Sequence, residues 1–462
     1  MKILRGTHHR RLLIVALLFF FLSDFADAQS PYDSVARRIA ATALTQNYTI
    51  GLLKELCAVG PRLSGSPQAA KAVAWAEKTM KRFGFDNVRL EPVTVPHWVR
   101  GPKEEAVAVP SRMRKIIPLS VTALGGSIAT PKKGITAGVV EVRSFEELHA
   151  LGDAAKGRIV FFNRPMDRGQ MSTFSAYGGA VDQRGSGAVE AAKVGAVAAL
   201  VRSMTTTIDD QPHTGGMRYA EGVTKVPVAA VSTLDADALS ALLKTDPNAR
   251  VRLVLSCETM PDIPSFNVVG EIRGSEKPDE VVVIGGHLDS WDKGDGAHDD
   301  AGGCSQSIEA LRLLKELGLT PKRTIRAVMF MNEENGLRGG TAYAAMDRPG
   351  EKHIAAIESD EGAFAPRGFG VGDSTAHAKL KAWEPVFAFM NADRIVLGGG
   401  GADIGPLARK GVPPIGLNVE SHRYFDYHHS HNDTVDKVNE RELALGAAAM
   451  AVLAYIISQE GL

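Results

Sequence analysis

Apolar positions recur with different spacings in successive parts of the chain. Between residues 30 and 83 they follow helical spacing, which predicts helices over 43–57 and 69–83, and alternation over 88–95 predicts a strand. From about 108 to 255 strand patterns dominate, which is typical of a compact, mostly-β unit. Its predicted strands cover 137–142, 158–162, 197–201, 226–231 and 251–255, and one short helix covers 188–195.

After Phe266 strands and helices alternate. The predicted strands cover 267–272, 281–286, 324–331, 354–359 and 414–418, and the predicted helices cover 302–317 and 440–457. Such alternation predicts an α/β fold with a mixed, largely parallel central sheet flanked by helices. We therefore expect a first part of this domain over 29–107, an inserted mostly-β domain over 108–258, and the main part over 259–462.

The first 28 residues have the pattern of a secretory signal peptide. Lys2, Arg5, Arg10 and Arg11 precede an apolar run over 12–22, and Ala26-Asp27-Ala28 matches a cleavage site. This predicts a secreted or periplasmic protein, with an uncleaved signal anchor as the alternative. Elsewhere no segment approaches 18 consecutive apolar residues, so we expect no stable membrane association after cleavage.

Charge and cysteine content exclude several classes of partner and site. The 53 basic and 53 acidic residues give a formal net charge of +0, so bulk charge favours neither nucleic acid nor an anionic membrane. Cys57, Cys257 and Cys304 form no CxxC pair, which favours buried free thiols over a thiolate metal site, with one disulfide as the alternative. The oligomeric state stays open, and a homodimer is compatible with the sequence.

Metal-ligating side chains follow the strongest predicted strands. His287 and Asp289 come after 281–286, Glu333 and Glu334 after 324–331, and Asp360 after 354–359. The carboxyl ends of strands in α/β sheets are where ligands gather. Each of these groups alone is more often surface polarity, but their coincidence at successive strand ends predicts a metal site.

Two further segments complete the set. Asp299 and Asp300 stand before glycines at the start of the 302–317 helix, and a histidine cluster over 428–431 follows the strand at 414–418. Imidazole and carboxylate ligands without thiolate suit catalytic zinc, with manganese or cobalt as weaker alternatives. The set suffices for two Zn²⁺ ions sharing one bridging carboxylate, and it leaves one of the adjacent glutamates free as a general base.

The motifs in this order resemble the co-catalytic zinc exopeptidases, a family that includes secreted aminopeptidases, and within it the carboxypeptidase Q branch. They are His287–Ser290, Gly296–Asp300, Glu333–Gly336, Glu358–Asp360 and His429–Thr434. The resemblance implies that Asp299 bridges the ions, that His287 and Asp360 bind one of them, and that Glu334 and His429 bind the other. It also implies that Glu333 is the general base and that Asp289 supports His287.

Some positions keep two interpretations. His428 and His431 are alternatives to His429 as the last ligand, and His298 is either a pocket residue or part of a turn. Four residues are candidates for substrate binding, each with packing or a plain loop as the alternative. Asp403, in the glycine-rich segment 399–403, would position a peptide terminus. Tyr424 or Tyr427 would donate a hydrogen bond to the oxyanion, and His298 is the fourth candidate.

The middle unit resembles a protease-associated domain at 157–162, 191–196 and 226–230. Taken together, the resemblances imply a metallo-exopeptidase whose substrates are dipeptides or short peptides. The alternatives are an aminopeptidase on longer peptides, a glutaminyl-cyclase-like acyltransferase, and a binding module without activity. The complete two-metal set argues against the last two, because such a cyclase uses one zinc and such modules lose ligands.

Overall fold

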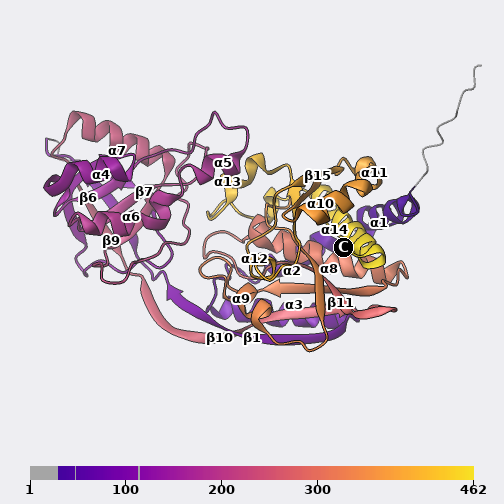
Figure 1. Cartoon of the computed structure of the whole chain (residues 1–462). Helices are drawn as coiled ribbons and strands as arrows, with labels where there is room; N and C mark the ends of the chain where they lie inside the picture. The colour runs from indigo at the N-terminus through magenta and orange to yellow at the C-terminus, as the bar shows by residue number, and fades with distance from the viewer. Residues whose placement is uncertain (1–29, 47, 113–114) are drawn as a thin grey trace, which may run out of the picture.

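The computed structural model describes residues 30–46, 48–112 and 115–462, so the predicted signal peptide lies outside the described residues. The described chain forms two lobes, each built on an eight-stranded sheet (Figure 1). The main lobe comprises residues 30–99 and 258–462, and the insert lobe comprises residues 104–255. The insert lobe therefore begins at strand β2 (Glu104–Val109), a few residues before the expected boundary at 108.

The sheet of the main lobe is mixed, with a parallel centre. Its strands, in spatial order, are β1 (Asp86–Val99), β10 (Glu258–Ile272), β12 (Arg323–Phe330), β11 (Lys277–His287), β13 (Lys352–Glu358), β16 (Pro414–Val419), β14 (Pro366–Val371) and β15 (Arg394–Leu397). Neighbours from β12 to β16 run parallel. β10 pairs antiparallel with both β1 and β12, β14 pairs antiparallel with β16, and β15 runs parallel to β14. The predicted fold class is confirmed in this sheet. Pro92 is accommodated because β1 is an edge strand.

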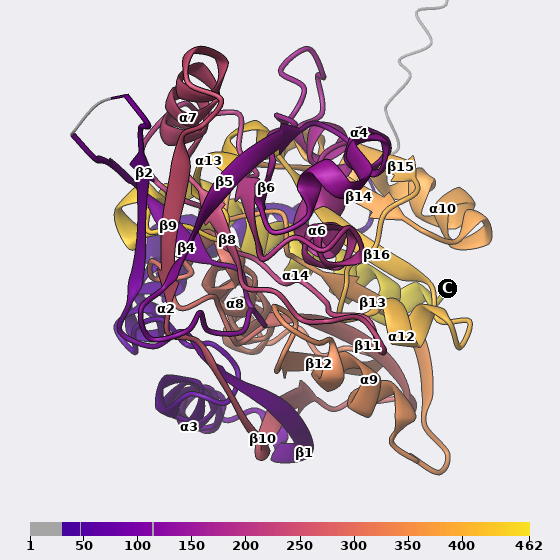
Figure 2. The ribbon, with the colours of Figure 1, turned by 90° about the vertical axis from the view of Figure 1, so that its left-hand side faces the viewer.

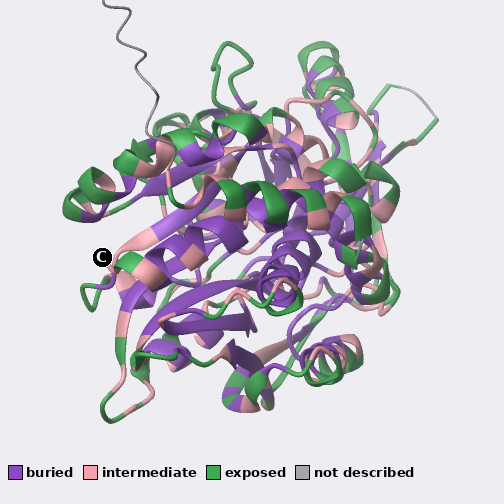
Figure 3. Cartoon of the chain, turned by 90° about the vertical axis from the view of Figure 1, so that its right-hand side faces the viewer, coloured by how far each residue is buried: buried purple, intermediate pink, exposed green. Residues whose placement is uncertain are grey.

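Helices cover both faces of this sheet, which explains why its central strands are apolar throughout. Val282 and Ile284 of β11 join the core under α1 (Asp33–Gln46), α2 (Tyr48–Cys57), α3 (Pro67–Arg82), α8 (Gly302–Glu316) and α14 (Glu440–Glu460). Val281 and Val283 join a separate core under α9 (Arg338–Ala345) and α12 (Gly405–Ala408). Figure 3 shows these strands buried between exposed outer helix faces. Alternate residues of one strand thus pack on opposite faces.

One helix in the described part of the chain, α14, is long and apolar enough to cross a membrane by length and composition. However, 78% of its most apolar window is buried inside the protein, where it packs against α8, α1 and α2. Its apolar surface is therefore used by the core. Cys57, Cys257 and Cys304 are free and buried, as the sequence favours.

The insert lobe contains more helix than the predicted mostly-β unit. Its strands follow the order β3 (Ile117–Leu119), β2, β9 (Arg250–Leu255), β5 (Ile135–Val142), β6 (Ile159–Phe162), β7 (Ala198–Arg202), β8 (Val228–Val231) and β4 (Val121–Ala123). Its helices are α4 (Phe145–Leu151), α5 (Thr173–Gly178), α6 (Asp182–Lys193) and α7 (Thr233–Thr245) (Figure 2). Only α6 was expected from the periodicity. Because β5, β6 and β7 run parallel, the chain needs crossovers between them, and α4 lies in the first crossover and α5 and α6 in the second.

The lobes are joined by a two-stranded ribbon and by contacts between packed side chains. Strand β10 pairs with β12 only from Val268 to Ile272, while its first part pairs with β1 alone as a two-stranded ribbon that leads to the insert lobe (Figure 1). On the opposite side, α5 lies beside α13 (Tyr424–Tyr427), where Phe174 stacks on Tyr424 with ring centroids 5.3 Å apart. The insert lobe therefore reaches the segment that carries the histidine cluster.

Candidate metal centre

The carboxyl ends of three parallel strands meet at one edge of the main sheet. His287 is the last residue of β11 and pairs in register with Phe330 near the end of β12. Gly285 pairs with Glu358, the last residue of β13. The residues that follow these strands are therefore brought side by side, as the sequence analysis expects.

The first cluster joins His287 to two carboxylates. Its Nε2 lies 3.1 Å from Asp299 Oδ1 and 3.3 Å from Asp360 Oδ1. These three ligand atoms lie close enough together to hold one ion. His287 is fully buried, and its other ring nitrogen, Nδ1, lies 3.0 Å from the backbone oxygen of Asp289, which fixes the ring.

The second cluster uses the other oxygen of the same aspartate. His429 Nε2 lies 3.2 Å from Asp299 Oδ2 and 3.1 Å from Glu334 Oε2. The remaining oxygen of Glu334 accepts a hydrogen bond from the Trp291 backbone N–H at 2.9 Å. The two oxygens of Asp299 thus face two separate groups of ligand atoms.

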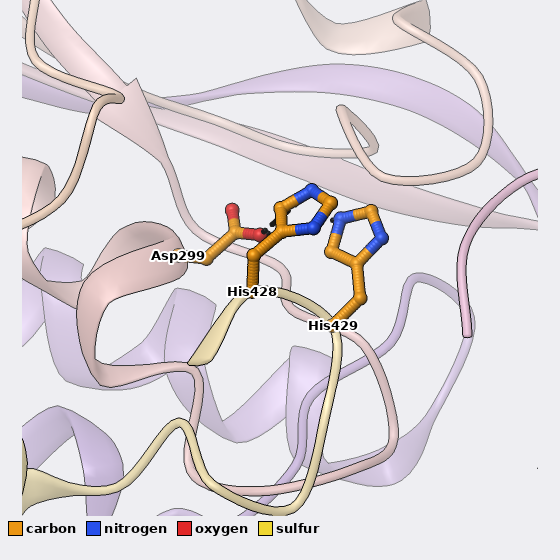
Figure 4. A group of neighbouring side chains, drawn as sticks. All are labelled: Asp299, His428 and His429. Carbon is orange, nitrogen blue, oxygen red and sulfur yellow. Dashed lines mark ion pairs between the residues drawn. The ribbon is translucent and has the colours of Figure 1, made fainter. Parts of the chain in front are cut away.

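The three histidine candidates differ in their approach to Asp299. His428 stacks on His429 with ring centroids 3.4 Å apart, and it forms with His429 and Asp299 another group close enough to hold an ion (Figure 4). However, His428 Nε2 is 4.0 Å from Asp299 Oδ2, whereas the His429 contacts are shorter than 3.3 Å. His431 is exposed. We therefore favour the grouping of His429 with Glu334.

Cations fit this arrangement of buried oxygens. Asp299 Oδ2, Glu334 Oε2 and Asp360 Oδ1 are buried and have no hydrogen-bond partner among the described residues. Burial and neighbouring carboxylates raise the pKa of Glu334 well above its ordinary value, and burial raises the pKa of Asp360. Burial opposes ionisation of Asp299 too, but the close contacts with the imidazoles of His287 and His429 hold its pKa well below its ordinary value. Carboxylates gathered in this way need positive charge nearby.

The loop that carries Asp299 is fixed by two other aspartates. Asp433 accepts hydrogen bonds from the backbone N–H groups of His298 and Asp299, at 2.7 and 3.1 Å. Asp300 accepts from the backbone N–H of His287 at 3.0 Å and from that of Gly303 at 2.8 Å. The Asp299 segment is therefore fixed by hydrogen bonds to carboxylates on both sides of it.

Asp289 has a different contact from the one the sequence suggested. Its backbone oxygen, and not its carboxylate, accepts from His287; the carboxylate oxygen is 3.9 Å from that ring nitrogen. The carboxylate accepts instead from the backbone N–H groups of Asn332 (2.7 Å) and Glu333 (3.1 Å) and from Ser64 Oγ (2.8 Å). It therefore fixes the turn that presents Glu333, because all three donors converge on it.

Glu333 lies among charged groups of the first cluster. Burial raises the pKa of its carboxyl to about 8, and the charges of Asp360, Asp299 and Asp289 add to the increase while His287 opposes it. Its backbone N–H donates to the Asp289 carboxylate. Of the two adjacent glutamates, Glu334 is the one whose carboxylate contacts His429.

The substrate-binding candidates fall into two groups. The His298 ring is stacked between the rings of Phe364 and Tyr427, with ring centroids 4.3 and 5.1 Å away. Its Nδ1 accepts a hydrogen bond from the backbone N–H of Ala363. This packing accounts for His298 and Tyr427 without a substrate. Tyr424 is buried, and burial together with the nearby acidic residues of the metal centre raises its pKa well above the ordinary value.

Asp403 is fully buried, and neither of its carboxyl oxygens has a hydrogen-bond partner in the described chain. Its backbone N–H lies 3.3 Å from Glu358 Oε1. Burial, with the charge of Glu358, raises the pKa of Asp403 well above its ordinary value. The side chain is therefore free to accept from a group that enters the site.

Several residues near the centre were missed by the sequence analysis. Fully buried Arg62 donates to the backbone oxygens of Leu288, Asp295 and Gly296 and so holds the loop after β11. From the insert lobe, Thr214 N–H donates to the His429 backbone oxygen at 2.9 Å, and His213 Nδ1 lies 2.6 Å from the His428 backbone oxygen. Nothing local marks these residues, because their partners lie more than 200 positions away.

Comparisons with known proteins agree with this geometry. Residues 267–455 match peptidase family M28. Carboxypeptidase Q of Mus musculus is 39% identical over 435 residues, which cover 92% of this chain and 90% of that protein. A solved peptidase M28 precursor from Shewanella amazonensis has a TM-score of 0.87 at 39% identity, covering 93% of this chain and 97% of that one.

A solved zinc aminopeptidase from Bacillus subtilis shares the fold, with a TM-score of 0.65 at 18% identity. The match covers 90% of this chain and 95% of the aminopeptidase. The similarity to carboxypeptidase Q extends beyond the residues that match the family, since it covers both lobes. The expected α/β fold and enzyme class are therefore confirmed. The chain belongs to peptidase family M28 and is a metallo-exopeptidase.

Proposed function

We propose that this protein is an exported exopeptidase that uses two zinc ions to hydrolyse dipeptides or short peptides. The observation that carries the proposal is the Asp299 carboxylate, whose two oxygens face His287 with Asp360 on one side and His429 with Glu334 on the other. Each side offers imidazole and carboxylate and no thiolate, which is the donor set of catalytic zinc. These five residues would hold the two ions.

Bound at these positions, the ions would polarise the scissile carbonyl and lower the pKa of a water molecule. Glu333 takes the proton from the attacking water and passes it to the nitrogen of the leaving amine. Burial raises the pKa of its carboxyl, which increases its basicity as a proton acceptor. Asp289 holds the turn beneath Glu333, so that the base keeps its orientation.

Two of the remaining candidates have contacts that suit a peptide. Asp403 offers a buried carboxyl group without partners, which would accept hydrogen bonds from the ammonium of a substrate N-terminus. Tyr424, which lies close enough to the acidic residues of the centre for them to raise its pKa, would donate to the developing oxyanion. The preference for short peptides is supported by the burial of the centre and by the insert lobe, which binds the backbone at His428 and His429.

Export is supported by the predicted signal peptide over 1–28. N-terminal sequencing of the protein recovered from outside the cytoplasm should give a mature chain that starts at Gln29. Recovery of the intact N-terminus in a membrane fraction would instead indicate a signal anchor.

The enzymatic proposal is tested by hydrolysis of paired substrates with bound metal quantified in the same sample. A free dipeptide and an aminoacyl chromogenic amide are each offered with and without a chelator. Chelator-sensitive cleavage of the dipeptide, with about two zinc ions per chain and little cleavage of the amide, is the expected result. Strong cleavage of the amide would indicate a general aminopeptidase, and no cleavage of either by zinc-loaded protein would overturn the proposal.

A further inference from the structure

One large side chain connects the metal centre with the core of the insert lobe. Trp291 lies in the loop that follows β11, yet only 2% of the residue is exposed, and it packs in the hydrophobic core that is formed mainly by the insert lobe. The end of its indole lies against Gly125, where an added Cβ atom would overlap Cη2 and Cζ3 of the ring. The absence of a side chain at Gly125 therefore provides the space that the indole occupies.

The backbone around Gly125 is tied to a second segment of the insert lobe. Its N–H donates to the Gly215 backbone oxygen at 2.9 Å, and its own oxygen accepts from the Met217 N–H at 3.1 Å. In the same segment, Thr214 N–H donates to the backbone oxygen of His429 at 2.9 Å. The space for the indole and the contact with His429 thus belong to one hydrogen-bonded unit.

The other side of Trp291 faces the second ligand cluster. Its backbone N–H donates to Glu334 Oε1 at 2.9 Å, while Glu334 Oε2 lies 3.1 Å from His429 Nε2. The rings of Trp291 and His429 also meet, with centroids 5.6 Å apart. The indole Nε1 has no hydrogen-bond partner in the described part of the chain, so packing holds this side chain in place. Trp291 therefore contacts both residues that share the second cluster with Asp299.

The backbone of His429 depends on such support more than that of His287 does. His429 has a φ of 60°, a left-handed conformation that is uncommon for a residue other than glycine and persists only where its surroundings hold it. His287 instead ends the regular strand β11. Its N–H donates to Asp300, and its Nδ1 lies 3.0 Å from the Asp289 backbone oxygen, so it is held within the main lobe.

We propose that Trp291 is a positioning residue for the second zinc ion, through which the insert lobe fixes the ligands Glu334 and His429. This inference rests on the proposed two-zinc function. A hydrogen bond to a ligating carboxylate orients that ligand, and loss of such a contact typically lowers metal affinity about 10- to 100-fold. With the indole removed from the insert lobe, the backbone N–H of Trp291 no longer fixes Glu334, and the second ion loses affinity. The ion at His287 and Asp360 keeps its affinity.

The test is a titration of the metal-free protein with Zn²⁺ against a competing chromophoric chelator. Trp291→Leu removes the indole, and Gly125→Ala fills the space for the indole without changing any residue of the main lobe. Each should lower the affinity for one ion about 10- to 100-fold and change that for the other by less than about threefold. Trp98→Leu is the matched control and should keep both affinities. Trp98 is a second buried tryptophan of the same core, and its indole N–H donates to the Ser127 backbone oxygen.

Two ligand variants identify which ion is affected. Glu334→Gln weakens the second position, and Asp360→Asn weakens the first. Trp291→Leu combined with Glu334→Gln should lower zinc affinity by less than the product of the two single effects, because both changes act on one contact. Combined with Asp360→Asn, it should give the full product, because those two residues act on different ions.

Circular dichroism checks the fold of each variant, and Trp291→Phe, which keeps a smaller ring beside Gly125, replaces Trp291→Leu if the latter does not fold. Equal weakening of both ions, or unchanged affinities in the Trp291 or Gly125 variants, would overturn the role of Trp291. The same selective loss in Trp98→Leu would also overturn it. A wild-type protein that does not bind a second zinc ion would instead overturn the proposed function, so the two failures are distinguishable.

Discussion

Replacing Asp289 tests whether the turn that carries Glu333 depends on a single buried carboxylate. Asp289 is fully buried and accepts from the backbone N–H groups of Asn332 and Glu333 and from Ser64 Oγ. Asp289→Ala leaves two backbone donors without a partner, and each costs about 1–3 kcal/mol when buried. We therefore expect a loss of about 2–6 kcal/mol in the free energy of unfolding, with a fall in kcat because Glu333 is no longer held.

Two matched variants separate the contributions. Asp289→Asn keeps an oxygen facing both N–H groups but removes the charge, so it should cost only about 1–2 kcal/mol. Ser64→Ala removes one of the three hydrogen bonds and should cost about 1 kcal/mol. The expected order of destabilisation is therefore Asp289→Ala, then Asp289→Asn, then Ser64→Ala.

The assay is urea unfolding followed by intrinsic fluorescence, in excess chelator so that metal binding does not contribute to stability. The values of kcat are then measured on zinc-loaded samples of the same preparations. The reasoning would be refuted if Asp289→Ala unfolded within about 0.5 kcal/mol of the wild type. It would also be refuted if Asp289→Asn and Asp289→Ala lowered kcat equally, since only the alanine variant removes the acceptor.

Three further substitutions test the centre and the attachment of the insert lobe. Glu333→Gln should retain both zinc ions in metal analysis and lose about 10²- to 10⁴-fold in kcat, and normal turnover would eliminate Glu333 as the base. Asp299→Ala should weaken the binding of both zinc ions, because the two clusters share this carboxylate. Metal analysis that finds two tightly retained ions would refute the bridging role of Asp299. Arg100→Met breaks the ion pairs with Asp292 and Glu104 and should lower the free energy of unfolding by about 2–4 kcal/mol. The expected loss is smaller than for a fully buried pair because Asp292 is partly exposed. An unchanged melting temperature would contradict this prediction.

The meeting of the proposed ligands was predictable because these residues follow strands with a strong signal of their own. β12 is buried at every residue from Arg323 to Phe330, and its apolar sequence identifies it as a central strand. Once strands of this kind are recognised, the polar residues after them must meet at one edge of the sheet. That reasoning brings together His287, Glu334 and Asp360 without knowledge of any contact.

The helices missed in the insert lobe carried weaker but usable signals. α7 begins after Ser232, whose side chain accepts from the backbone N–H of Asp235 as an N-cap. Its buried residues Ala236 and Leu239 are three positions apart, as on one face of a helix. Strand patterns on both sides of this short segment hid a helix that cap and periodicity together indicate.

Other features depend on long-range geometry that no local pattern records. Whether His287 meets the carbonyl or the carboxylate of Asp289 is decided by the conformation of the turn, since both oxygens belong to one residue. Arg62 lies in a turn-rich loop typical of the surface, and only the folded chain shows that loop 288–296 closes over it.

The contact between the lobes also involves the metal ligands directly. Trp291 belongs to the loop after β11, but its side chain is packed into the core of the insert lobe, against Gly125. The backbone N–H of the same residue donates to Glu334, and Thr214 of the insert lobe donates to the backbone of His429. Glu334 is therefore hydrogen-bonded to a residue whose side chain packs in the insert lobe, and the backbone of His429 is hydrogen-bonded to that lobe directly. His287 and Asp360 directly end or follow strands of the main sheet, so the proposed second cluster is the one that is built in part by the contact between the lobes.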